Sequence, residues 1–109
     1  MKLTIIPVDG AVYKDGYSYS GLDLSAAPSN VHALQWKDTK GWIEFTDNDD
    51  GTKPQNEAIT ELPSWANDCL NKWQEAENAR IAKDIADAIL LEEYEKSRTQ
   101  PVTEGTQQI

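Results

Sequence analysis

The pattern of apolar and polar positions along the chain changes near residue 60. Before that point, short apolar segments alternate with turn signals such as Asp9-Gly10 and Asp15-Gly16, which favours tightly connected antiparallel strands. After it, one helical pattern runs from Leu62 to about Arg98 without a glycine or an internal proline. The chain therefore predicts an α+β fold, in which a small antiparallel β-meander of four to five strands is followed by one long C-terminal α-helix.

The clearest hairpin is predicted for residues 31–36 and 41–46. Alternation along the second strand places Ile43 and Phe45 toward the core and leaves Trp42 exposed on the opposite face. Trp36 and Trp42 are expected to form a cross-strand aromatic pair. In the first strand, one face is expected to carry Val31, Ala33 and Gln35, and the other His32, Leu34 and Trp36.

The helical pattern begins with an apolar stripe that predicts packing across the sheet. The stripe consists of Leu62, Ala66, Cys69, Trp73 and Ala76. Its register then slips, and apolar residues resume at Ile81. The predicted organisation is a β module at residues 1–62, an amphipathic helix at residues 63–98 that packs on the module through its first half, and a disordered polar tail at residues 99–109.

The second half of the predicted helix carries apolar side chains that a small β module cannot cover. Apolar surface of this kind needs a partner, which we expect to be a protein. Trp42 is expected to act as a second anchor, because tryptophan is favoured at protein interfaces. A homo-oligomer formed through the same helix segment is the other arrangement that the pattern allows. The predicted partner-binding residues are Trp42, Ile81, Ile85, Ile89 and Leu90.

The net charge of −9 comes from 19 acidic and 10 basic side chains spread over both halves of the chain. Binding of nucleic-acid phosphates or of an anionic membrane needs basic side chains gathered on one face, so neither partner is expected. Residues 1–7 are not expected to form a signal peptide, and no run of about 18 apolar residues predicts a transmembrane helix. The single cysteine, Cys69, excludes an intramolecular disulfide and is expected to be a buried thiol in a reducing, cytosolic setting.

Catalytic and metal-binding patterns are weak. Residues 46–57 align in part with a calcium loop of the EF-hand type, but Thr46 stands where an aspartate is required and Pro54 interrupts the loop. We favour a turn whose Asp and Asn side chains cap their own backbone. His32 is the only histidine and has no neighbouring residues patterned for nucleophilic catalysis. No enzyme activity, catalytic residue, cofactor or metal is therefore expected.

Several motifs in the first part of the chain carry a resemblance to a known family. They are Gly21-Leu22-Asp23-Leu24-Ser25, Pro28-Ser29-Asn30-Val31-His32-Ala33-Leu34-Gln35-Trp36, Gly41-Trp42-Ile43-Glu44-Phe45 and Asn56-Glu57-Ala58-Ile59-Thr60-Glu61-Leu62. Together they resemble small proteins of tailed bacteriophages that are encoded beside tail-fibre genes, some of which are tail-fibre assembly proteins or chaperones. The resemblance covers residues 1–75 and carries no catalytic motif. Larger fibre-assembly proteins have a longer client-binding region than this chain, so a small structural tail subunit is a second role that the resemblance implies.

The resemblance implies a tail-fibre-associated protein that binds a tail-fibre or other tail protein. It would act in the host cytoplasm during phage assembly, and in the virion if it is a structural subunit. The alternative is an acidic phage anti-defence protein that occupies a basic nucleic-acid-binding site of a host protein. Binding through apolar helix residues depends weakly on salt, whereas binding through charge collapses as salt rises.

Overall fold

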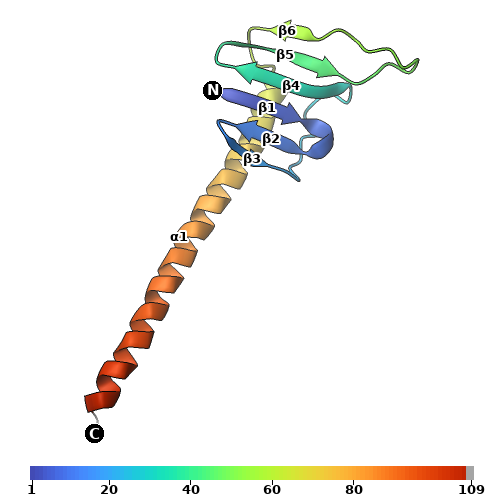
Figure 1. Cartoon of the computed structure of the whole chain (residues 1–109). Helices are drawn as coiled ribbons and strands as arrows, with labels where there is room; N and C mark the ends of the chain where they lie inside the picture. The colour runs from blue at the N-terminus through green and yellow to red at the C-terminus, as the bar shows by residue number, and fades with distance from the viewer. Residues whose placement is uncertain (108–109) are drawn as a thin grey trace. The chain divides into compact units, whose positions relative to one another are not determined.

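The computed structural model describes the backbone of residues 1–107 and the side chains of residues 1–97. Its elements are β1 (Lys2–Ile6), the 3-10 helix η1 (Pro7–Asp9), β2 (Ala11–Lys14), β3 (Tyr17–Tyr19), β4 (Val31–Lys37), β5 (Lys40–Phe45), β6 (Glu57–Ile59) and α1 (Ser64–Gln107). The six strands form one antiparallel sheet in the order β3-β2-β1-β4-β5-β6 (Figure 1). The predicted α+β class is confirmed, and the sheet has one strand more than the largest number expected.

The additional strand is β6, which pairs with β5 at the edge of the sheet. Its register places Ala58 opposite Trp42 and Ile59 opposite Gly41. The sequence pattern predicted no strand here, because a three-residue strand is too short to show alternation. β6 therefore adds one edge strand to the sheet beside the predicted hairpin.

Gly10 fixes the connection between β1 and β2. It follows η1 with a left-handed φ of 59°, and its N–H donates to the carbonyl oxygen of Pro7. A Cβ at this position would lie 2.6 Å from the carbonyl oxygen of Leu22, so only glycine fits without a shift of the backbone. The Leu22 N–H donates to the Gly10 carbonyl at 3.0 Å. This contact holds the following loop against the core, where Leu24 is buried.

A β-bulge in β4 changes which of its side chains face the core. The register of β4 on β5 shifts between Val31 and Ala33, which advances the alternation by one residue. Val31 and Leu34 therefore both belong to the core, and His32 is exposed. The predicted grouping of Val31 with Ala33 and Gln35 on one face is wrong for this reason.

The predicted aromatic pair between Trp36 and Trp42 is also wrong. Trp36 lies opposite Gly41 in the β4–β5 ladder, and Trp42 lies opposite Gln35. Because successive side chains alternate between faces, neighbouring rows of the ladder place the two indoles on opposite sides of the sheet. Trp36 packs against the core, whereas Trp42 is exposed. The assignment of Trp42 to the exposed face is confirmed.

The core lies between one face of the sheet and the first turns of α1, as the apolar stripe predicted. Ala66, Cys69 and Trp73 are buried, and Leu62 is half-buried against them. The buried cluster consists of Leu3, Ile5, Val12, Leu24, Val31, Leu34, Ile43, Ala66, Cys69 and Trp73. Every member lies in the first of two compact units, Met1–Ala76, so this unit contains a complete core of its own.

Trp73 joins the helix to the edge of the sheet. Its indole N–H donates to the carbonyl oxygen of Tyr17 at 3.1 Å, and its ring packs edge-on against Tyr19 with 5.8 Å between centroids. The Lys14 ammonium lies 4.7 Å from the centre of the same ring, within cation–π range. One side chain thus satisfies its polar group and contacts both β2 and β3.

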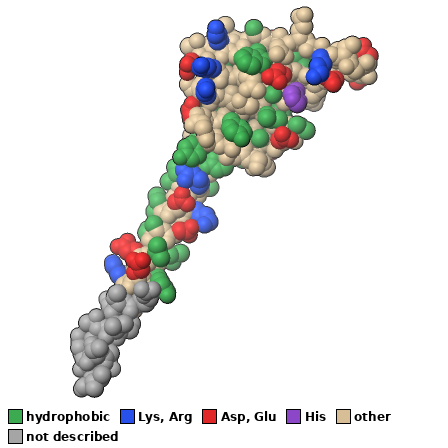
Figure 2. Space-filling view, viewed as in Figure 1, with side chains coloured by type: hydrophobic (Ala, Val, Ile, Leu, Met, Phe, Trp, Pro, Cys, Tyr) green, Lys and Arg blue, Asp and Glu red, His purple; other side chains and the backbone are tan. Residues whose placement is uncertain are grey.

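The second unit begins at Glu77 and consists of the rest of α1. From Asn78 to Ser97 every side chain is exposed, and Figure 2 shows hydrophobic and charged side chains interspersed along the helix. α1 ends at Gln107, which is later than the predicted end at residue 98. The disordered tail predicted for residues 99–109 lies outside the residues whose side chains are described, and it stays a prediction.

Trp73→Phe is expected to lower the free energy of unfolding by about 1–3 kcal/mol, because phenylalanine keeps part of the apolar contact but loses the donor to Tyr17. Urea denaturation of the full chain measures this loss. Trp42→Phe is the matched control and should change the free energy by less than about 1 kcal/mol, since Trp42 is half exposed. Equal losses in the two variants would contradict the place of Trp73 in the core.

Candidate interaction surfaces

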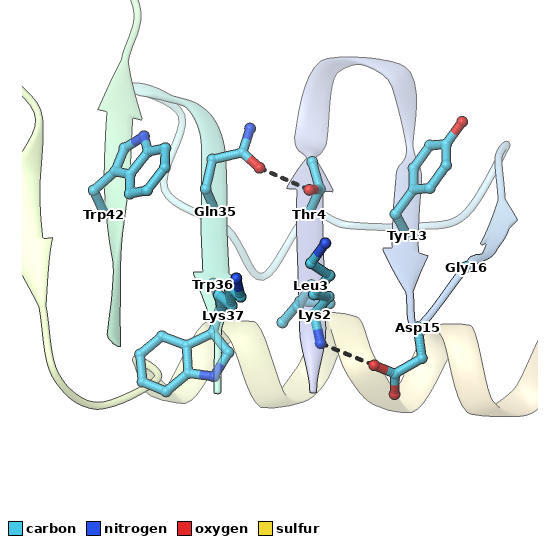
Figure 3. A pocket seen from close by; sticks show the side chains of 10 residues that line it. All are labelled: Lys2, Leu3, Thr4, Tyr13, Asp15, Gly16, Gln35, Trp36, Lys37 and Trp42. Carbon is cyan, nitrogen blue, oxygen red and sulfur yellow. Dashed lines mark hydrogen bonds between the residues drawn. The ribbon is translucent and has the colours of Figure 1, made fainter. Parts of the chain in front are cut away.

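The outer face of the sheet, which is the face away from the core, carries a row of side chains across four strands. The pairing register aligns Tyr13 on β2, Thr4 on β1, Gln35 on β4 and Trp42 on β5. All four point to the same side of the sheet in Figure 3. Together with residues at one end of the sheet they line a shallow cleft of about 380 Å³. We call these four residues the aromatic row.

The aromatic row combines two exposed rings with a polar centre. Tyr13 is 51% exposed and Trp42 is 45% exposed. Between them, the Thr4 hydroxyl donates to the Gln35 side-chain oxygen at 2.7 Å, and the Trp42 indole N–H donates to the Glu44 carboxylate at 2.8 Å. These bonds orient the Gln35 amide and the Trp42 ring in the free protein, so the cleft presents ring faces and hydrogen-bonding groups together.

Sequence reasoning identified Trp42 and missed the other three members of the aromatic row. Trp42 is recognisable because it opposes Ile43 and Phe45 within one predicted strand. Tyr13, Thr4 and Gln35 come from strands whose pairing joins distant parts of the chain, and no local pattern indicates that β1 lies beside β4. The role of Trp42 as a protein-binding anchor stays a prediction.

The second unit exposes three isoleucines in line. Ile81, Ile85 and Ile89 are 43%, 56% and 50% exposed, and their spacing of four residues places them on neighbouring turns of α1. We call them the isoleucine stripe. Leu90 was predicted to act with them and is 63% exposed, but it lies about 100° round the helix from Ile89. The stripe is therefore narrower than the predicted set.

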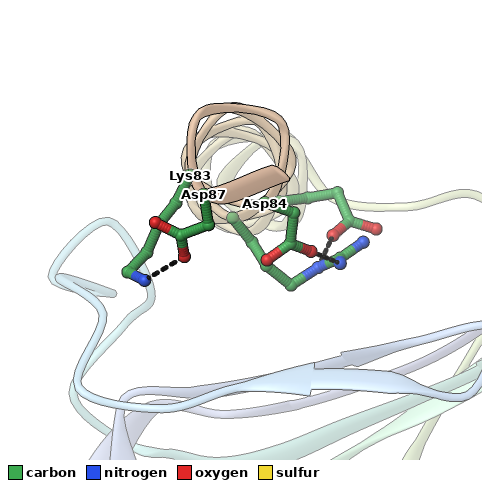
Figure 4. Close-up of polar contacts among 5 residues, drawn as sticks. Lys83, Asp84 and Asp87 are labelled. Atoms are coloured by element: carbon green, nitrogen blue, oxygen red, sulfur yellow. Dashed lines mark hydrogen bonds and ion pairs between the residues drawn. The ribbon is translucent and has the colours of Figure 1, made fainter. Parts of the chain in front are cut away.

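The charged side chains of the same helix segment pair with one another (Figure 4). Arg80 bonds Glu77 and Asp84 at 2.8 Å each, and Lys83 bonds Asp87 at 2.7 Å. Exposed pairs at these spacings stabilise a helix by about 0.3–0.5 kcal/mol each. At about 100° per residue, Lys83 and Asp87 fall on the side of the helix opposite the centre of the isoleucine stripe. The charged side chains thus pair within the helix, and among residues 1–97 no element covers the isoleucine stripe.

The polar loop after β5 is closed by its own side chains. The Asp50 carboxylate accepts hydrogen bonds from the Thr52 hydroxyl at 2.6 Å and from the Thr52 N–H at 3.0 Å, and these bonds lower the pKa of Asp50. The interpretation of this loop as a self-capped turn is confirmed. Among residues 1–97, no group of three or more His, Cys, Asp or Glu side chains is arranged to hold a metal ion.

Cys69 is buried in the core, as the apolar stripe predicted. Burial raises the pKa of its thiol to about 11, and the nearby charge of Asp68 adds to the effect. A thiol that keeps its proton and has no access to solvent is a poor nucleophile. Cys69 is therefore a packing residue rather than a reactive one.

Comparison with protein-family models, with curated proteins and with solved structures found no match to this chain. Within the part of the chain that the structure describes, no helix combines the length and the apolar character that crossing a bilayer requires. What the protein does must therefore be inferred from its own residues and surfaces.

The free energy of unfolding is expected to fall as pH rises from about 9 to about 11, because the Cys69 thiol ionises near pH 9.0 in the unfolded chain and only near pH 11 in the folded one. Below pH 9 both states keep the proton, so the contribution is complete there. Urea unfolding across this range measures the fall. Cys69→Ala lacks the titrating group, and its stability should decline less over the same interval. Parallel profiles for the two proteins would show that the thiol is not buried as described.

Proposed function

We propose that this protein is a bacteriophage tail-fibre-associated protein that works by binding another protein, as a chaperone or as a small structural subunit of the tail. The observation that carries the proposal is the isoleucine stripe, an exposed apolar row on a helix whose charged side chains already pair with one another. The resemblance of residues 1–75 to small proteins encoded beside tail-fibre genes supports the client class. Its place of action is the host cytoplasm during assembly, and the virion if it is a structural subunit.

The isoleucine stripe suits a client that offers an apolar groove or an incompletely folded surface. An amphipathic helix binds such a groove through anchors one turn apart. Full burial of an isoleucine that was exposed stabilises a complex by about 1.5–3 kcal/mol before the entropic costs of association. Trp42 and Leu90 offer further exposed apolar contacts. A second copy of the chain could occupy the stripe in the absence of the client, which would produce a dimer.

An acidic anti-defence protein is the second candidate function, and the polar loop favours it. Asp47, Asp49 and Asp50 are exposed together in this loop. Such a group could face a basic site on a host protein, where its attraction would be long-ranged at low salt and screened at high salt. The two functions therefore differ in which residues carry the binding and in how binding responds to salt.

Ile85→Ser combined with Ile89→Ser is expected to weaken binding to the proposed tail-fibre client by about 100-fold, because two apolar anchors are lost from the interface. Co-expression followed by titration of the purified proteins measures the affinity, and light scattering measures the mass of the complex. Leu91→Ser is the matched control. Leu91 is 59% exposed on the same helix but outside the isoleucine stripe, so this change should alter the affinity by less than about threefold.

Salt separates the two candidate functions. Raising the salt concentration from about 0.05 M to about 0.5 M should change the wild-type affinity by less than about threefold if the isoleucine stripe carries the binding. Binding to a host protein that collapses over this range, and that the isoleucine variant leaves intact, would favour the acidic anti-defence function. A chain that remains monomeric beside the fibre protein would refute the tail-fibre proposal.

A further inference from the structure

Three lysines lie side by side on the outer face of the sheet. Lys2 on β1 pairs with Lys37 on β4, which in turn pairs with Lys40 on β5. Alternation along the strands places them on the same face as the aromatic row, and all three are exposed. Basic side chains gather at one end of the sheet in Figure 2. This lysine row is a local positive surface on a chain whose net charge is −9.

No acidic side chain pairs with the lysine row among residues 1–97. The ion pairs of lysine and arginine side chains there involve Lys14, Lys72, Arg80, Lys83 and Lys96. The two acids at this end of the sheet are already engaged: Asp38 bonds the Met1 ammonium at 3.1 Å, and Asp15 accepts the backbone N–H of Lys2 at 2.8 Å. Like charges at directly paired strand positions repel and destabilise a sheet. An anion above the lysine row would relieve that repulsion.

The aromatic row lies directly beside the lysine row. It is two residues further along each strand, a distance of about 7 Å, and its two rings stand about 14 Å apart across three strand spacings. The cleft in Figure 3 is lined by members of both rows, including Lys2, Lys37, Gln35, Trp42 and Tyr13. Positive charge, ring faces and hydrogen-bonding groups thus meet in one open cleft.

We propose that this cleft binds an acidic oligosaccharide, whose sugar units bear carboxylate or sulfate groups. The anionic groups would meet the lysine row in charge-assisted hydrogen bonds. The apolar faces of the sugar rings would pack on Trp42 and Tyr13, and the sugar hydroxyls would donate to Glu44 and exchange hydrogen bonds with Gln35. The site lies wholly within the first unit and does not involve the isoleucine stripe, so it stands independently of the tail-fibre proposal.

Glu44 favours a saccharide over a single-stranded nucleic acid. Bases could stack on Trp42 and Tyr13, and phosphates could meet the lysines. However, the Glu44 carboxylate is bonded to the Trp42 indole N–H at 2.8 Å, so it places negative charge beside the stacking ring. A carboxylate accepts hydrogen bonds from the hydroxyl groups of a sugar and repels any anion beside it, so the anionic groups of the ligand must lie over the lysine row, about 7 Å from the aromatic row. The cleft therefore fits a ligand that brings hydroxyl donors together with its anionic groups.

An NMR titration of the full chain tests the proposal. The probes are short fragments of polygalacturonate, hyaluronan and heparin, and the signal is the indole N–H resonance of Trp42, identified with Trp42→Phe. At least one fragment should shift this resonance with a Kd of about 1 mM or tighter at low salt, and a neutral chitin fragment should bind at least about fivefold more weakly. Lys37→Gln should weaken binding of the acidic fragment about fivefold, and Tyr13→Ala about tenfold.

Matched variants separate the cleft from general charge and from folding. Lys53→Gln removes an equal charge in the polar loop, and Tyr94→Ala removes an exposed ring from the second unit; both should leave the affinity unchanged. An unchanged pattern of the remaining resonances shows that each variant is folded. The proposal is overturned if no acidic fragment shifts Trp42, if Lys53→Gln weakens binding as much as Lys37→Gln, or if a single-stranded oligothymidylate binds more tightly than every saccharide. The isoleucine variant should bind the saccharide normally, so a failure here is distinct from a failure of the tail-fibre proposal.

Discussion

The burial of Trp73, Cys69 and Ala66 against one face of the sheet is the contact on which the rest of the fold depends. A sheet of short strands has no stable core until an apolar element covers one of its faces. The first turns of α1 supply that element, and Trp73 ties it to β2 and β3 through a hydrogen bond and an edge-on ring contact. Because the helix covers one face of the sheet, the outer face can carry polar and exposed side chains without disrupting the core.

That asymmetry explains where the candidate surfaces lie. The outer face is released from core packing, so its rows can hold lysines, exposed rings and a hydrogen-bonded Thr4–Gln35 pair without loss of the core. Trp73 is the last residue along the chain that belongs to the core cluster. The helix segment after Ala76 is therefore not needed to fill the core. Its apolar side chains, the isoleucine stripe among them, are available to a partner. The first unit can therefore bind a ligand through its outer face, and the second unit can bind a protein through the isoleucine stripe.

Local spacing determined what could be predicted from the sequence. The helix stripe from Leu62 to Ala76 and the hairpin that contains Ile43 and Phe45 follow from periods of 3.6 and 2, and both were recognised. The bulge between Val31 and Ala33 was not, because an extra residue in a strand leaves no mark on composition. It was enough to place Val31 in the core with Leu34 and to leave His32 exposed.

The outer-face cleft could not be predicted, because it depends on pairing between distant strands. Lys2 and Lys37 become neighbours only when β1 joins β4, and the same pairing brings Thr4 beside Gln35. The net charge of −9 gave no sign of the lysine row, because a total charge does not show where individual charges lie. Such long-range register is a property of the whole sheet rather than of any segment within it.

Residues 1–76 contain every member of the core cluster, and the segment after Ala76 is free for binding. Urea unfolding of a fragment that ends at Ala76, beside the full chain, tests this division of the chain. We expect a cooperative transition in the fragment, with a free energy of unfolding within about 1 kcal/mol of the full chain, because no member of the core cluster is removed. A fragment that is unfolded, or whose free energy of unfolding is several kcal/mol lower, would instead show that the segment after Ala76 is part of the fold.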